Sequence, residues 1–403
     1  MFDFPWPTDP ISPFLFLFLP HPSPATQDLC IEDCADVGMY GVKFFVHGKW
    51  ITVVIDDLFP CVSSGNGWQP IFASPKSHQE QAEGEMEIWS MIFEKAWAKF
   101  HMSYENTAGG QTGDTHNYLT GGSVMGYDFD ETPKEELWKI IVDALDEQDM
   151  FVSCAGVADV QGPAIDMGLI TGHAYSILKA VQASNGERLV QIRNPWGQTE
   201  WNGAYSDSDS VWTPQLSGEC GHVDQNDGTF FMSLDDFCKW FGDIEVCDPT
   251  RVKTLSETTS ARLDCFASNW VSEQTAGGPH TCSVTFKHNP TCELTVTRTG
   301  KAQFSTYKRD ARPIKKLDGV EKELQPKVIV YLKEKGSDDK PQEVIELHGW
   351  QRMASSVVEL TAGVTYQVIC STWAPGVTGD SQLHTPPRIS DLGLRAIYSF
   401  THF

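Results

Sequence analysis

The sequence is poor in the cysteine spacings that hold zinc or form a disulfide framework. None of the eleven cysteines forms a CxxC pair, and the closest two, Cys30 and Cys34, have no ligand partner at zinc-site spacing. Scattered, unpaired cysteines in a chain of 403 residues favour a reducing compartment. We therefore expect a cytoplasmic protein without a structural zinc site.

Basic residues are scarce in the first part of the chain. Residues 1–250 hold 11 Lys and Arg against 38 Asp and Glu (11 − 38 = −27), whereas residues 251–403 hold 19 against 16 (19 − 16 = +3). Phosphate backbones are bound by Lys and Arg, so the acidic part argues against nucleic acid as a partner. It is compatible with metal cations, although a solvated acidic surface is the more frequent meaning. The change in charge near residue 250 predicts two domains.

A hydrophobic run long enough to cross a membrane is missing from the amino-terminal region. The apolar run Phe14–Leu19 is too short to span a bilayer, no basic residue precedes it and no clear cleavage site follows. We expect residues 1–36 to form a disordered leader rich in Pro, Phe and Leu. The alternative is a mis-set start that does not belong to the folded protein.

Hydrophobic periodicity predicts a mixed α/β domain over residues 37–250. The expected elements are two strands within 40–60, helices within 85–105 and from Thr132-Pro133, strands over 172–181 and 187–193, and a helix and strand over 235–246. Residues 61–84 and the glycine-rich 107–122 are predicted to be loops, the latter without a phosphate-binding motif. From residue 260, six or more short β runs predict a separate antiparallel sandwich over 260–403.

Two residues at the open end of the predicted 172–193 hairpin have the chemistry of a thiol protease. A thiol nucleophile needs a base, and the imidazole needs a group that fixes its tautomer. His173 and Asn194 are of these types, but an ideal two-residue turn at Asn185-Gly186 would pair Asn194 with Ile177. Direct contact therefore requires a longer loop or offset strands. The alternative is a core histidine near a turn asparagine.

The residues around this pair resemble the calpain family of cysteine proteases. The segments "GHAYSI" and "IRNPWGQTEWNGAYSD" contain His173 and Asn194, and three further segments are similar to calpain segments in the same order: "GVKFFVHGKWITVVIDDLFP", "IWSMIFEKAWAKFHMSYENTAGGQTGDTHNYLTGG" and "DGTFFMSLDDFCKWFGDIEVCD". Residues 273–296 are similar to the start of the calpain C2-like domain. The resemblance covers roughly residues 37–403 and implies a papain-like half-domain with an antiparallel sheet, followed by an all-β C2-like sandwich.

The resemblance also implies roles for individual residues. His173 would be the catalytic base, Asn194 the group that orients it, and Trp196 the ring that shields their hydrogen bond from water. Calpains also bind calcium, and the matching ligands here would be Glu200, Asp207, Asp227 and the carbonyl of Gln225. One further acidic position falls on Thr229, so we expect weaker calcium binding.

The nucleophile is the point at which the sequence departs from the family. Calpains carry it in a Gly-Asp-Cys-Trp segment at a helix N-terminus, and none of the eleven cysteines here is followed by Trp. Cys154 lies in a predicted buried strand, where a structural role is expected. We therefore expect the chain as given to be inactive, either as a fragment or mis-set start of a calcium-dependent endopeptidase that cleaves intracellular proteins or as a catalytically dead homologue.

The dead homologue would act by binding proteins through its cleft and its sandwich domain. A third alternative is a module that contacts membrane lipids through the C2-like domain. The basic run "KRDARPIKK" at 308–316 would then be attracted to anionic lipid headgroups.

Overall fold

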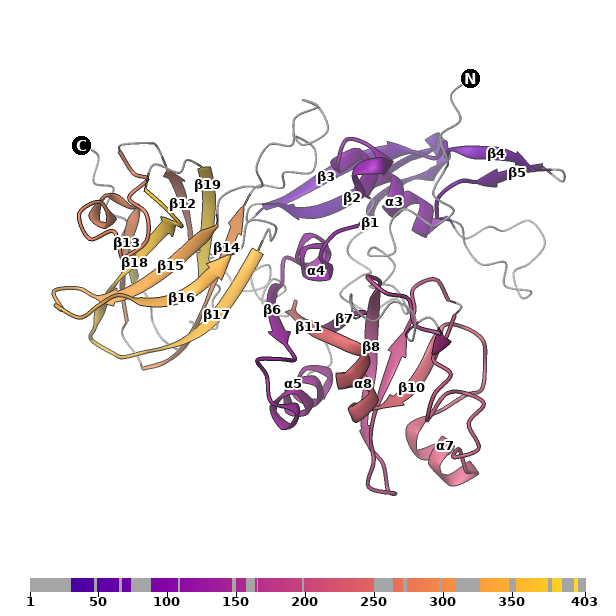
Figure 1. Ribbon diagram of the computed structural model, residues 1–403. Helices are drawn as coiled ribbons and strands as arrows, with labels where there is room; N and C mark the ends of the chain where they lie inside the picture. The colour runs from indigo at the N-terminus through magenta and orange to yellow at the C-terminus, as the bar shows by residue number, and fades with distance from the viewer. Residues whose placement is uncertain are drawn as a thin grey trace. The chain divides into compact units, whose positions relative to one another are not determined.

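The computed structural model describes residues 30–46, 49–64, 67–73, 88–107, 109–146, 150–156, 164, 166–197, 199–249, 264–270, 274–296, 299–308, 327–347, 353–375, 379–385 and 395–397. The chain forms two compact units, one mainly of residues up to Asp248 and the other mainly of residues from Pro249 (Figure 1). Each unit is described separately.

The first unit begins with a small sheet that extends into the expected leader. Strands β1 (Cys30–Cys34), β2 (Met39–Val46) and β3 (Lys49–Asp56) lie in the order β1-β2-β3, with the 3-10 helix η1 (Ala35–Val37) between β1 and β2. Disorder was expected up to residue 36, but residues 30–36 form β1, which pairs antiparallel with β2, and most of η1. The remainder of the leader, including Phe14–Leu19, lies outside the described residues.

Aromatic packing joins this sheet to the predicted first helix. Helix α3 (Trp89–Phe100) places Trp97 and Phe100 each 5.5 Å from the ring of Phe44 on β2, measured between ring centroids. Strands β4 (Cys61–Ser64) and β5 (Gly67–Pro70) form a hairpin in part of the segment 61–84 that was expected to be a loop. The 3-10 helix η2 (Tyr104–Thr107) follows α3.

The glycine-rich segment 107–122 was expected to be a loop, but it contains helix α4 (Thr112–Thr120). All of its residues except Asp114 are buried, although most of them are polar, so the segment lacks the apolar periodicity that reveals a helix. Its first turn is held instead by a tertiary contact, because Glu245 accepts hydrogen bonds from the Thr112 hydroxyl and from the Gly113 amide, the latter at 2.6 Å.

A six-stranded sheet forms the centre of the first unit. Its strands lie in the order β10-β9-β8-β7-β11-β6 (Figure 1), and they are β6 (Ser123–Asp128), β7 (Phe151–Gly156), β8 (Ala174–Gln182), β9 (Arg188–Arg193), β10 (Thr229–Ser233) and β11 (Phe241–Asp248). Helices α5 (Lys134–Asp146) and α8 (Leu234–Trp240) share one apolar core with the sheet, whereas α7 (Pro214–Cys220) packs in a smaller cluster near the β8–β9 turn.

Helix α4 contacts the opposite face of this sheet. Cys154 on β7 faces the apolar core, and its neighbour Ser153 donates a hydrogen bond of 2.8 Å to the Thr112 hydroxyl on α4. Because successive strand residues point to opposite faces, α4 lies across the sheet from α5 and α8.

Two irregularities set the register of the β8–β9 hairpin. Gln182 pairs with Arg188, which leaves a loop longer than an ideal two-residue turn, and Gly186 has a φ of 93° there. A bulge between Ile177 and Lys179 then shifts the ladder, so that Ile177 pairs with Ile192 and Ser176 with Arg193. Both departures from the ideal hairpin, a longer loop and offset strands, are present.

In the second unit, the described residues are arranged in two antiparallel sheets. Strands β12 (Asp264–Trp270), β14 (Gly300–Lys308), β17 (Met353–Leu360) and β19 (Gly379–Thr385) form one, in the order β12-β19-β14-β17. Strands β13 (Thr291–Thr295), β15 (Val328–Glu334), β16 (Gln342–Leu347), β18 (Thr365–Thr372) and β20 (Arg395–Ile397) form the other, in the order β16-β15-β18-β13-β20.

One apolar cluster joins the two sheets, with Phe304 and Leu360 from the first and Val330 and Val368 from the second. Residues 282–288, which are "CSVTFKH" and belong to the short β runs expected from residue 260, form turns and the 3-10 helix η3 (Phe286–His288) in place of a strand. The basic run 308–316 lies outside the described residues except for Lys308 at the end of β14. Within the described parts of the chain, no helix has the length and apolar character needed to cross a membrane.

Candidate active site

His173 and Asn194 meet at the open end of the β8–β9 hairpin. His173 immediately precedes β8, and Asn194 immediately follows β9. With the observed register, the next step of the ladder places Asn194 opposite Tyr175, two residues from His173 on the same face. The His173 Nε2 atom lies 2.9 Å from Asn194 Oδ1, and the two residues are 5 % and 0 % exposed. The structure thus brings together the pair that the sequence predicted.

The hydrogen bonds around Asn194 define the orientation of its amide. Its Nδ2 group donates to the carbonyl of Thr199 at 3.0 Å, and its Oδ1 atom accepts from the backbone amide of Trp196 at 3.1 Å. An amide oxygen only accepts hydrogen bonds, so the His173 Nε2–H group must be the donor of the hydrogen bond to Oδ1. In the neutral ring this fixes the tautomer with the proton on Nε2 and the lone pair on Nδ1.

Two aromatic rings enclose the histidine. The Trp196 ring centroid lies 4.5 Å from that of His173 at an interplanar angle of 50°, and the Tyr175 ring meets His173 edge-on at 5.0 Å. Tyr175 is fully buried, and its hydroxyl accepts a hydrogen bond of 2.8 Å from the Ile170 amide. Trp196 is therefore placed where a ring would exclude water from the His173–Asn194 hydrogen bond.

Strand β10 fixes the backbone of Asn194. Thr229 at the start of β10 pairs with Arg193, and the Gly228 carbonyl accepts a hydrogen bond of 2.7 Å from the Asn194 amide. The Asn194 carbonyl in turn accepts from the Gly197 amide at 2.9 Å. The parts played by Gly228 and by the Thr199 carbonyl were not predicted from the sequence, since both act through backbone atoms. At position 228 the residue type is a clue, because a glycine can indicate a close backbone contact.

Several described thiols are in environments that oppose thiolate formation. Burial raises the pKa of the Cys154 thiol well above its usual range and raises the pKa values of Cys247 and Cys292 to about 12. Burial also raises the pKa values of Cys220 and Cys238. Cys154 is 1 % exposed within the apolar core of the six-stranded sheet, where its thiol is packed as a small apolar group.

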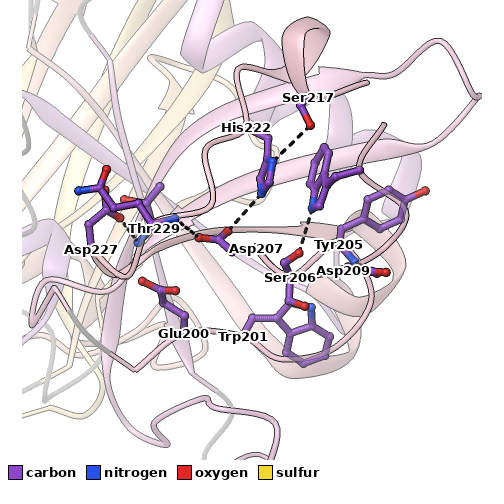
Figure 2. A network of polar contacts seen from close by, with 12 residues as sticks. Glu200, Trp201, Tyr205, Ser206, Asp207, Asp209, Ser217, His222, Asp227 and Thr229 are labelled. Carbon is purple, nitrogen blue, oxygen red and sulfur yellow. Dashed lines mark hydrogen bonds and ion pairs between the residues drawn. The ribbon is translucent and has the colours of Figure 1, made fainter. Parts of the chain in front are cut away.

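The acidic residues proposed as calcium ligands lie on neighbouring loops beside the sheet. Figure 2 shows Glu200, Asp207 and Asp227 in this region. Glu200 Oε1 accepts a hydrogen bond of 2.6 Å from the Gly228 amide, Asp207 Oδ2 accepts from the Gln225 amide at 3.3 Å, and Asp227 Oδ1 accepts from the Thr229 amide at 2.8 Å. The Gln225 carbonyl accepts from the Asp227 amide at 2.8 Å.

Burial and neighbouring negative charges in this acidic loop region raise the pKa of Asp207. Partial burial raises the pKa of Asp207 to about 6, and the negative charges of Glu200, Asp224 and Asp227 contribute in the same direction. His222 Nε2 lies 3.7 Å from Asp207 Oδ1, and burial lowers the pKa of His222. We expected the carboxylates to lie close enough to share an ion, but no group of three or more His, Cys, Asp or Glu side chains among the described residues is placed to hold a metal. Backbone amide donors occupy one oxygen of each carboxylate instead.

Comparison with known proteins connects this geometry to one family. The family model described as "Calpain family cysteine protease" matches residues 24–248. The chain is 39 % identical over 222 residues to calpain-type cysteine protease DEK1 of Zea mays, which covers 53 % of this chain and 10 % of that protein. It is 32 % identical over 296 residues to calpain-9 of Homo sapiens, covering 69 % and 41 %, and 35 % identical over 271 residues to calpain-B of Drosophila melanogaster, covering 63 % and 28 %.

The chain therefore spans at most 41 % of the length of these three relatives. The family match starts at residue 24, whereas the boundary expected from the sequence lies at residue 37. It includes the whole six-stranded sheet and both residues of the buried His-Asn pair. The family model matches more than half of the chain, and the protein belongs to the calpain family of cysteine proteases.

Proposed function

We propose that this chain supplies the histidine and asparagine of a calpain-type cysteine endopeptidase that cleaves internal peptide bonds of proteins. The observation that carries the proposal is the buried hydrogen bond of 2.9 Å between His173 Nε2 and Asn194 Oδ1 beside the Trp196 ring. Because Nε2 is held by Asn194, the Nδ1 atom is the one with a lone pair for a thiol proton.

In the proposed reaction, His173 moves the protons of both steps. Nδ1 accepts the thiol proton, and the thiolate attacks the peptide carbonyl carbon. The imidazolium then protonates the leaving amine as the C–N bond breaks, which leaves a thioester. A water molecule that loses its proton to Nδ1 hydrolyses the thioester and restores the thiol. Asn194 keeps the ring in one orientation throughout, because Nε2 carries its proton in both the neutral imidazole and the imidazolium.

A fusion tests this assignment. The 403-residue chain is joined behind the subdomain of a calpain relative that carries the Gly-Asp-Cys-Trp segment, and turnover of a fluorogenic peptide is measured with calcium present. We expect activity that His173→Ala abolishes and that His288→Ala, a change at an exposed histidine of η3, leaves intact. An active fusion that tolerates His173→Ala would refute the role of His173.

We further propose that the acidic loop region binds calcium weakly. Glu200, Asp207, Asp227 and the Gln225 carbonyl offer only oxygen, which is the ligand type that calcium prefers, and the mutual repulsion of the carboxylates supports a cation between them. The loops must close further to share an ion, and Thr229 replaces an acid, so low affinity is expected. Titration calorimetry should detect calcium binding that Asp207→Ala removes and Asp235→Ala, a change at an exposed acid on α8, preserves. Equal binding by both variants would exclude this site.

The alternative function is that of a catalytically inactive calpain homologue that binds proteins or membranes. The buried, high-pKa thiols favour it, because the described Cys154 is no substitute for an activated nucleophile. In this case the C2-like sandwich proposed for the two antiparallel sheets of the second unit would be the binding module, and the run at 308–316 would contact anionic lipid. Cosedimentation of the protein with phosphatidylserine vesicles, compared with neutral vesicles, tests the lipid contact.

A further inference from the structure

Glu200 is connected to the His173–Asn194 pair through one backbone unit. Its Oε1 atom accepts a hydrogen bond of 2.6 Å from the Gly228 amide, and the Gly228 carbonyl accepts one of 2.7 Å from the Asn194 amide. The carboxylate thus fixes the position of residue 228, which in turn fixes the backbone of the residue that orients the imidazole.

The contact between residues 228 and 194 is too close for any side chain. A Cβ atom on Gly228 would lie 2.7 Å from the Asn194 carbonyl oxygen and 2.6 Å from the Gly197 Cα atom. Gly228 also has a φ of 87°, which L side chains rarely adopt. Residue 228 therefore transmits a small displacement directly to Asn194, because no flexible side chain lies between them.

Glu200 is itself attached to a fixed segment. Its carbonyl oxygen would lie 1.9 Å from a Cβ atom on Gly168, so the two backbones touch. Next to it, the Asn202 amide donates to the Met167 carbonyl at 3.1 Å. Thr199, the residue before Glu200, has a φ of 66° and accepts the Asn194 Nδ2 hydrogen bond through its carbonyl. The segment that carries Glu200 therefore holds both the side chain and the backbone of Asn194.

We propose that Glu200 is a positioning residue for the His173–Asn194 pair, acting through the Gly228 amide independently of any cation. The inference rests on the proposed function, in which Asn194 orients His173. It differs from the calcium proposal in the property of Glu200 that matters. Positioning requires a hydrogen-bond acceptor at Oε1, whereas ligation of a cation requires the negative charge.

Replacement by glutamine separates the two properties. Glu200→Gln keeps an oxygen acceptor of the same reach and removes the charge, and Glu200→Ala removes both. The matched control is Glu219→Ala, because Glu219 accepts a backbone hydrogen bond of 2.7 Å from Ser184 at the far, turn end of the same hairpin. The readout is the imidazole Nε2 proton of His173, observed by nitrogen-edited NMR of the full chain with a chelator present. The exchange of this proton with water reports on its hydrogen bond to Asn194.

We expect the Nε2 proton to exchange about tenfold faster in Glu200→Ala, as loss of a hydrogen bond of ordinary net strength allows. Glu200→Gln and Glu219→Ala should match the wild type. Wild-type exchange in Glu200→Ala, or equal acceleration in both Glu200 variants, would overturn the inference. If Glu200→Ala does not fold, Glu200→Asp takes its place, because it keeps the charge but shortens the reach. Absence of a protected Nε2 proton in the wild type would instead contradict the proposed function.

Discussion

Glu245 is a partly buried carboxylate at the contact between helix α4 and the six-stranded sheet. It accepts hydrogen bonds from the Thr112 hydroxyl and the Gly113 amide, at the N-terminus of α4. Burial raises its pKa to about 7, against the lowering effect of these two hydrogen bonds, and the charges of Asp114 and Asp243 raise it further. The folded protein therefore retains this proton at pH values where the unfolded chain has lost it.

The first prediction concerns Glu245→Gln. A folded-state pKa of about 7 above an ordinary value of 4.5 means that the folded state binds more protons between these pH values. The wild-type free energy of unfolding should then fall, relative to that of the variant, by at most about 1.4 kcal/mol per unit as pH rises through this window. Urea unfolding of both proteins from pH 4.5 to 7 measures the difference. Parallel curves would contradict it, and Glu135→Gln, at an exposed site, should not reproduce the trend.

Residue types and their neighbours predicted the His173–Asn194 pair because its chemistry resides in side chains. Thr199 supports the same pair through its carbonyl, which any residue type possesses, so no side-chain pattern predicts its part. Position 228 differs, because its close backbone contact requires glycine. Glu200 was predicted as a calcium ligand from the resemblance to the calpain family. Glu200 also accepts a hydrogen bond from the Gly228 amide. This contact requires the loops that carry the two residues to lie close together, and sequence spacing does not predict such an arrangement.

Helix α4 depends on a tertiary contact more than on its own sequence. The Thr112 hydroxyl donates to Glu245 and accepts a hydrogen bond of 2.8 Å from Ser153, so it joins two strands to the helix N-terminus. A buried polar group left without its partner costs about 1–3 kcal/mol.

The second prediction is that Thr112→Val lowers the free energy of unfolding by about 1–3 kcal/mol, because it leaves Ser153 and Glu245 each short of a partner. Thr213→Val serves as the control. The Thr213 hydroxyl caps the first turn of α7 by accepting from the Leu216 amide, so loss of this cap should cost only about 1 kcal/mol. A smaller loss in Thr112→Val than in the control would show that α4 does not depend on the buried contact.

Elements with strong periodicity were predicted from the sequence, and irregular ones were not. The strands on either side of His47-Gly48, helix α3 and the β8–β9 hairpin were found where apolar spacing placed them. Helix α4 was missed because its buried face is polar. The bulge between Ile177 and Lys179 was foreseen only as a requirement that the strands be offset, since nothing local distinguishes Leu178 from its neighbours in the strand.

Among the described residues, each of the two units has its own main apolar core. Phe237 is fully buried in the core of the six-stranded sheet, and Phe304 is fully buried in the cluster shared by the two sheets of the second unit. The third prediction is that calorimetry resolves two unfolding transitions. Phe237→Ala should lower only one midpoint and Phe304→Ala only the other, each through a loss of about 3–5 kcal/mol. A single transition lowered equally by both variants would contradict this division.

The last prediction concerns activity of the 403-residue chain on its own, for which we expect no turnover of fluorogenic peptides at any calcium concentration. His173 and Asn194 contact each other, but the proposed catalytic unit also needs a thiolate beside His173, and the members of such a unit do not contribute additively. None of the eleven cysteines stands in a Gly-Asp-Cys-Trp segment, and burial raises the pKa of Cys154, the cysteine on the strand next to β8. Water activated by His173 alone would lack a covalent intermediate. Calcium-dependent turnover that a thiol alkylator blocks would show that one of the chain's own cysteines serves as the nucleophile.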